Sequence, residues 1–309
     1  MGRRRQTVES SEETVRPAEE CPRRARERWA RIRGAGAAAT RVGTVLCLLA
    51  GIAAGSARSG EAQPSWRSVA GGVEYAALAL EQPSPFGDGV LHVVRIDPKT
   101  ATLRAYMASE PGERPRTARE WCEAKGLVAA INLGMYQTDM RSNVGHARKG
   151  THLNSKGFNA YRSYLGFDPH RSDLPPVVFL DGEDPDVRSV LADYGTAIQN
   201  LRLIRAPGIN VWEKQDKRWP EAAIAQDDAG RVLFLLTQTP FSMWEFNRQV
   251  LALPLGIRRA MHVEGGPEAS LSICSPGLAL HLSGQYENGA DGASRQRTIP
   301  NIVGVLAGK

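Results

Sequence analysis

The chain has 309 residues, of which 42% are hydrophobic and 23% charged, the usual balance for a globular protein with a sizeable core. Its formal net charge is +6, but residues 1–41 hold eleven arginines and six acids and therefore account for +5 of that charge. The remaining chain has almost no basic excess, which argues against a nucleic-acid-binding surface.

The N-terminal part of the chain has the layout of an export signal. The basic region 1–41, which we predict to be disordered, is followed by a short apolar run at 42–54 and then by small and polar residues. A run of about 13 residues is shorter than the roughly 20 needed to cross a bilayer. We therefore predict a signal sequence and linker at 42–65 and a periplasmic or secreted protein. A membrane anchor formed by residues 42–54 is the alternative.

The cysteines do not suggest a metal site. None of the four has C-x-x-C spacing or a paired histidine pattern, so no metal is predicted, and no glycine-rich phosphate or dinucleotide motif indicates a cofactor. Cys122 and Cys274 would remain after signal removal. In an exported protein they could form a disulfide or stay as two separate buried thiols.

Short apolar runs separated by turn residues begin at position 73 and predict strands. Residues 97–100, with Pro98, predict a turn of the kind that joins two hairpin strands, and residues 226–231 predict a second hairpin. The predicted strands are 73–79, 91–96, 103–108, 127–132, 164–167, 177–180, 201–205, 222–226, 232–237, 260–263, 271–273, 278–282 and 302–306.

Helices are fewer, and two of them have clear start signals. A capping box predicts a helix over 117–125, a second capping box predicts one over 242–252, and 186–193 is a third, shorter candidate. Because helices do not alternate regularly with strands, a doubly wound parallel sheet fits poorly. We predict a single α+β domain over 73–309 with a mixed, largely antiparallel sheet core and a few flanking helices.

The run Glu264-Gly265-Gly266 follows the apolar strand at 260–263 directly. Its two glycines allow a turn tight enough to bring backbone N–H groups close to a ligand, and the carboxylate is a candidate for catalysis. An ordinary strand-to-turn junction is the alternative interpretation.

Polar side chains at the ends of other apolar runs are candidate ligand contacts. The Asn132 amide could donate to and accept from a sugar hydroxyl or a phosphate oxygen, or it could simply cap a turn. Asn154 and Gln199 end similar segments. Arg205 and Arg218 could hold an anion through a guanidinium fork, although most arginines are only solvated surface.

Six segments, in the same order, resemble the phosphodiester glycosidase family, which includes the lysosomal uncovering enzyme and many exported bacterial proteins. The resemblance covers nearly all of residues 73–309. The segments are 130–136, 145–154, 198–204, 222–235, 262–266 and 299–305.

The resemblance assigns roles to individual positions of this sequence. It implies that Asn132 contacts sugar or phosphate, that Glu264 stands for the family's catalytic aspartate, and that Gly265 and Gly266 match its glycines. There are departures from the family pattern at Leu133, Asn200-Leu201-Arg202, Glu221 and Pro267-Glu268; Glu221 stands where the family often has an arginine.

The chemistry that the resemblance implies is cleavage of the bond between an anomeric carbon and a phosphate. Glu264 would act as nucleophile or stabilise positive charge on the sugar, and Arg205 or Arg218 would bind phosphate. Gln199 and Asn154 would contact the substrate. The candidates for a second carboxylate are Glu268, Asp227 and Asp181.

These observations predict an exported hydrolase that cleaves a glycosyl phosphodiester in an envelope or extracellular glycan, with no nucleic-acid partner. Two alternatives stay open. The departures from the family pattern are compatible with a catalytically inactive glycan-binding module, and the apolar run at 42–54 with a membrane-tethered structural protein. The sequence does not indicate an oligomeric state.

Overall fold

The computed structural model describes residues 64–81, 86–284 and 296–308, which belong to one compact unit, Ser59–Lys309. The predicted basic region 1–41 and the apolar run 42–54 lie outside these residues, so the predicted export signal and tether stay predictions. None of the helices in the described ranges is long and apolar enough to span a membrane.

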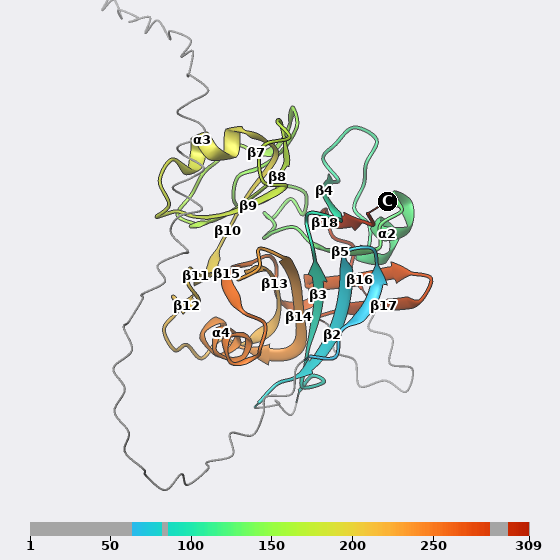
Figure 1. The fold of residues 1–309 in the computed structure, drawn as a ribbon, viewed down its shortest axis with the longest axis vertical. Coiled ribbons are helices and arrows are strands. Elements are labelled where there is room, and N and C mark those ends of the chain that lie inside the picture. Colours follow the sequence, from blue (N-terminus) through green and yellow to red (C-terminus); the bar gives the residue numbers. More distant parts are fainter. Residues whose placement is uncertain (1–63, 82–85, 285–295, 309) are drawn as a thin grey trace, which may run out of the picture. The chain divides into compact units, whose positions relative to one another are not determined.

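Three sheets make up the described fold (Figure 1). The first has the order β1-β2-β3-β14-β13-β15-β11-β12, with strands Arg67–Ala70, Val73–Ala79, Val90–Ile96, Val232–Phe241, Trp219–Asp227, Ile257–His262, Arg202–Arg205 and Ile209–Asn210. The second has the order β7-β6-β10-β8-β9, with strands His152–Ser155, Ala147–Lys149, Tyr194–Asn200, Ser163–Pro169 and Val177–Asp181. The third has the order β17-β16-β5-β18-β4, with strands Leu278–Ser283, Ser270–Ser275, Ala129–Asn132, Asn301–Leu306 and Thr102–Met107.

Three α-helices flank these sheets in the described part of the chain: α2 (Ala118–Lys125), α3 (Val187–Ala192) and α4 (Met243–Ala252). Both predicted capping boxes are present, at Thr117 and at Ser242, and α2 stops at Gly126 in the left-handed conformation. Helix α2 packs on β5 and β16, and α4 lies beside β11 and β12 (Figure 1).

Two expectations about the sheets are wrong. Every strand pairing among the described residues is antiparallel, so the sheets are not mixed. Parallel pairs usually need a helical crossover, and the described part of the chain has only three α-helices. The turn at 97–100 does not close a hairpin either. It leads from β3 in the first sheet to β4 in the third, because β2 and β14 already occupy both edges of β3.

The core follows from the alternation of side chains along strands that are buried on both faces. In β14, Phe234 and Leu236 point into a core shared by all three sheets, whereas Leu233 and Leu235 point to the opposite face. Phe246 of α4 covers that opposite face. The first sheet is therefore a buried layer from which strand ends can present side chains rigidly.

The two cysteines lie together beneath α2. Both Cys122 on α2 and Cys274 on β16 are free thiols, and their side chains are hydrogen-bonded to each other. This hydrogen bond and burial raise the pKa of Cys122 well above that of an ordinary thiol. The sequence left open a disulfide or two separate buried thiols; in the structure both cysteines are free, with Cys122 buried and Cys274 half-buried.

Candidate functional site

Glu264 lies where the chain passes from the first sheet to the third. Strand β15 ends at His262, the Val263 N–H donates to the Ala222 carbonyl of β13 at 3.1 Å, and β16 begins in the third sheet at Ser270. A short 3₁₀ turn, η1 (Gly266–Glu268), makes the connection. The backbone segment that carries the Glu264 carboxylate is therefore held between two sheets.

The glycines after Glu264 are required by the geometry of this turn. A Cβ atom on Gly265 would lie 2.3 Å from Cδ1 of Trp219, so the backbone approaches the indole ring more closely than any other residue allows. Gly266 has a φ of 65°, in the left-handed region. The motif Glu264-Gly265-Gly266 is thus a turn packed against an aromatic ring.

A pocket of about 370 Å³ opens beside Glu264. Glu264 contributes a carboxylate, and the surrounding side chains supply three basic groups and an aromatic surface. The pocket is lined by Met135, Lys217, Arg218, Trp219, Met243, His262, Glu264, Gly265 and Gly266.

The backbone and side chain of Glu264 are held by residues at the end of β5 and in the loop that follows it. The Asn132 amide at the end of β5 donates to the Glu264 carbonyl at 3.2 Å and accepts from the Ser270 N–H at 3.1 Å. The Tyr136 N–H donates to Glu264 Oε2 at 3.0 Å. Burial raises the pKa of the Glu264 carboxyl; the Tyr136 N–H and His262 oppose this rise only in part.

A buried pair that the sequence analysis did not single out lies beneath the same pocket. Glu221 on β13 is fully buried; its Oε1 makes a very short contact with Nδ1 of His262, and its Oε2 accepts from Nε1 of Trp219 at 2.7 Å. Burial by itself lowers the pKa of His262, but the Glu221 carboxylate outweighs this effect, so the pKa is raised. The sequence feature that could have revealed this pair is an acid and a histidine, each inside an apolar strand.

The structure separates the two arginines proposed as phosphate ligands. Arg218 lines the pocket, where Glu245 of α4 holds it through two contacts of 2.8 and 2.5 Å. The same arginine lowers the pKa of Glu245 to about 2, against a smaller opposing effect of burial. Arg205 on β11 is not among the lining residues and pairs with Glu183 at 2.8 Å.

Gln199 and Asn154 hold loops in place through hydrogen bonds in the described structure. Gln199 is buried, accepts from the Asn159 N–H at 3.1 Å and donates to the Asn159 carbonyl at 3.0 Å. Asn154 accepts from the Asn143 N–H at 2.7 Å and donates to Ser109 Oγ at 2.7 Å. Neither lines the pocket beside Glu264.

The three candidates for a second carboxylate are each engaged by an arginine. Glu268 is the one whose charge acts on Glu264, since it contributes to the raised pKa of that residue. The ion pairs are Glu268 with Arg297 at 2.7 Å, Asp227 with Arg231 at 2.6 Å, and Asp181 with Arg202 at 2.6 Å.

Among the residues described, no group of three or more His, Cys, Asp or Glu side chains is arranged to hold a metal ion.

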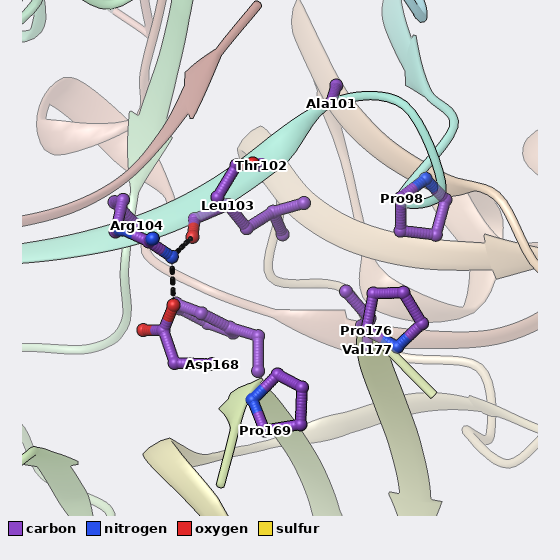
Figure 2. Close-up of a pocket in the computed structure, with 10 residues that line it drawn as sticks. Pro98, Ala101, Thr102, Leu103, Arg104, Asp168, Pro169, Pro176 and Val177 are labelled. Carbon is purple, nitrogen blue, oxygen red and sulfur yellow. Dashed lines mark hydrogen bonds and ion pairs between the residues drawn. The ribbon is translucent and has the colours of Figure 1, made fainter. Parts of the chain in front are cut away.

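A second pocket of similar volume, about 370 Å³, lies against β4, β8 and β9 (Figure 2). Its charged groups neutralise each other: Arg104 pairs with Asp168 and also donates to the Leu103 carbonyl at 3.1 Å. The other oxygen of Asp168 accepts from Thr196 Oγ1 at 2.7 Å. Because the polar atoms are already paired and the rest of the lining is largely apolar, this pocket is a weaker candidate for chemistry.

Two solved structures resemble this fold at low sequence identity. A hypothetical protein from Synechocystis has a TM-score of 0.56 and 13% identity; the match covers 76% of this chain but only 62% of that one. The catalytic domain of zebrafish N-acetylglucosamine-1-phosphodiester alpha-N-acetylglucosaminidase, auto-inhibited by its pro-peptide, has a TM-score of 0.53 and 14% identity. That match covers 75% of this chain and 87% of the zebrafish domain. No curated protein sequence matches the chain.

The family comparison covers the part of the chain that builds the site. A family model described as phosphodiester glycosidase matches residues 125–306, more than half of the chain. This range contains Asn132, the Glu221–His262 pair and the Glu264 turn. The chain belongs to the phosphodiester glycosidase family.

Proposed function

We propose that the protein is an exported hydrolase that cleaves the bond between the anomeric carbon of a sugar and a phosphate in an envelope or extracellular glycan. One observation carries the proposal: the half-buried Glu264 carboxylate faces a pocket of about 370 Å³ whose other charged groups are basic. A phosphodiester brings both a negative charge and a sugar ring to such a site. Membership of the phosphodiester glycosidase family supports this assignment.

The geometry supports a division of roles within the pocket. The anomeric carbon becomes positively charged as its bond to the phosphate oxygen breaks, and Glu264 is the carboxylate placed to stabilise that charge or to attack the carbon. Arg218 and Lys217 provide positive charge for the phosphate. The face of Trp219 offers a surface for an apolar sugar face.

The test is release of sugar from an aryl phosphodiester of N-acetylglucosamine by the purified protein. Replacing Glu264 with glutamine keeps the shape of the side chain but removes the charge, and we expect about a 10²–10³-fold lower rate. Absence of sugar release by the wild type, or an unchanged rate in Glu264→Gln, would contradict the proposal.

A glycan-binding module without catalysis is the second candidate. The observation that favours it is the engagement of Arg218 by Glu245, which leaves the guanidinium partly neutralised. Calorimetric titration with the same phosphodiester separates the two candidates. Binding without turnover in the wild type would favour the module, whereas turnover favours the hydrolase.

A further inference from the structure

The strands beneath the pocket bring a buried carboxylate and a buried imidazole together. Glu221 lies on β13 and His262 on β15, two adjacent antiparallel strands in which Ala223 is paired with His262. Both oxygens of Glu221 are occupied, one by His262 Nδ1 and the other by the Trp219 indole N–H. The carboxylate is therefore fixed in place.

This arrangement defines which ring nitrogen of His262 faces the pocket. A carboxylate beside Nδ1 holds a proton on that nitrogen and fixes the orientation of the ring. In the described part of the chain, His262 Nε2 makes no hydrogen bond, and His262 lines the same pocket as Glu264. Nε2 is thus the nitrogen that can exchange a proton with a bound molecule.

We propose that His262 is the general acid of the reaction and that Glu221 is its positioning residue, an assignment that rests on the proposed glycosyl phosphodiester hydrolysis. As the bond from the anomeric carbon to the phosphate oxygen breaks, its electron pair stays on that oxygen, and His262 Nε2 delivers a proton to the departing phosphate. Water then attacks the anomeric carbon and returns a proton to Nε2. The net reaction adds one water across the cleaved bond.

The charges around the imidazole suit this role. Burial favours the neutral ring, whereas the carboxylates of Glu221 from β13 and Glu264 from the following turn favour the protonated one. Lys217 and Arg218 are the other charged groups that line the pocket. The balance raises the pKa of His262 above its ordinary 6.5. A larger share of the rings therefore carries a proton near neutral pH than in an exposed histidine.

The chemistry of the leaving group determines how much the rate should fall when the general acid is removed. A phosphate monoester leaves readily, so proton donation is less necessary than for an alcohol. We therefore expect loss of the acid to reduce kcat by about 10²-fold, the lower end for general acid catalysis. A purely structural role of the pair would lower stability without changing how the remaining activity depends on pH.

The experiment measures kcat/KM against pH for the wild type, His262→Gln and Glu221→Gln, using full-length protein and the aryl phosphodiester of N-acetylglucosamine. The wild type should lose activity at alkaline pH as His262 deprotonates. This alkaline decline should be absent in His262→Gln. It should move to lower pH in Glu221→Gln, because the neutral amide no longer favours the imidazolium.

A matched control is available in His92, a histidine on β3 that pairs with Asp88 at 2.9 Å and does not line the pocket. His92→Gln removes a histidine–carboxylate pair of the same kind, and its pH profile should match that of the wild type. Should His262→Gln not fold, Glu221→Gln and the control still decide the question, because only the former should shift the alkaline decline.

The outcomes separate this inference from the function on which it rests. No release of sugar by the wild type would overturn the proposed hydrolysis and this inference with it. Release by the wild type with the same alkaline decline in His262→Gln, or an unshifted decline in Glu221→Gln, would overturn the assignment of His262 alone.

Discussion

The side-chain amide of Asn132 donates a hydrogen bond of 3.2 Å to the main-chain carbonyl of Glu264, a residue 132 positions further along the chain. The same amide accepts from the Ser270 N–H. Asn132 therefore anchors both ends of the segment that carries the candidate catalytic carboxylate. These two hydrogen bonds explain why a polar side chain lies at a fully buried strand end, and they do not require Asn132 to contact substrate.

Replacing Asn132 with alanine should lower both stability and activity. One buried and one partly buried backbone group would lose their partners, so we expect a loss of about 2–4 kcal/mol in the free energy of unfolding, measured in urea. The displaced carboxylate should lower kcat. Asn154→Ala is the matched control, because Asn154 also pins a loop but lies away from the pocket. A fall in kcat for Asn154→Ala as large as that for Asn132→Ala would contradict this interpretation.

The pH dependence of the reaction should show the raised pKa of Glu264 on its acid side. A carboxylate acts only when ionised, and burial favours the neutral form. Activity should therefore begin to fall at a higher pH than the ordinary glutamate value of 4.5 as the solution is acidified. A profile of kcat/KM against pH measures this, and an acid-side midpoint at or below the ordinary value would be inconsistent with the prediction.

The same pKa predicts how stability depends on pH. Because the folded-state pKa is raised, the folded protein binds the Glu264 proton more tightly than the unfolded chain. The associated stability is present below the unfolded value and is lost as pH rises through the folded value. Glu264→Gln should then match the wild type at about pH 4 and be more stable at about pH 7. Urea unfolding at both pH values tests this; equal stability at the higher pH would count against it.

Gly265→Ala should damage the site more than Gly266→Ala. The new Cβ at position 265 would collide with the Trp219 ring, which also holds Glu221, and overpacking of this kind destabilises by about 1–3 kcal/mol. At position 266 a Cβ meets nothing within 4 Å, so only the left-handed backbone costs about 1–2 kcal/mol. Urea unfolding and kcat distinguish the variants; an unchanged kcat for Gly265→Ala would disprove the coupling to Glu221.

Arg218 and Arg205 provide a matched pair for testing phosphate binding. Arg218→Ala should raise KM about 10-fold with little change in kcat, since it removes a contact made equally in the ground and transition states. Arg205→Ala should leave KM unchanged, because Arg205 lies on β11 and pairs with Glu183. Initial-rate kinetics decide; a higher KM in Arg205→Ala than in Arg218→Ala would reverse the assignment.

Local signals in the sequence were sufficient for individual elements. Helices α2 and α4 could be located because each capping box uses residues only three positions apart, and the hairpin of β13 and β14 because its turn is short. Strand β10 was not predicted, because its polar residues Thr196, Gln199 and Asn200 break the apolar pattern. Those side chains are buried, and they make hydrogen bonds that the sequence alone does not show.

The arrangement of the sheets and the composition of the site required the structure. Residues 97–100 have the chemistry of a hairpin turn, but which strands lie beside β3 depends on partners far along the chain. Likewise, Glu221 and His262 are 41 positions apart, and only the pairing of β13 with β15 brings them into contact. The Glu264 turn could be selected from sequence, whereas the imidazole beneath it could not.

Glu264 is carried by a connection between two sheets, and His262 belongs to one of them. A small slide of the third sheet against the first would therefore change the spacing between carboxylate and imidazole while leaving every strand paired. Substitutions in the shared core, such as Phe234→Leu, should impair turnover before they unfold the protein. The reaction rate of this protein is therefore expected to respond to smaller changes in the packing between the sheets than the melting temperature does.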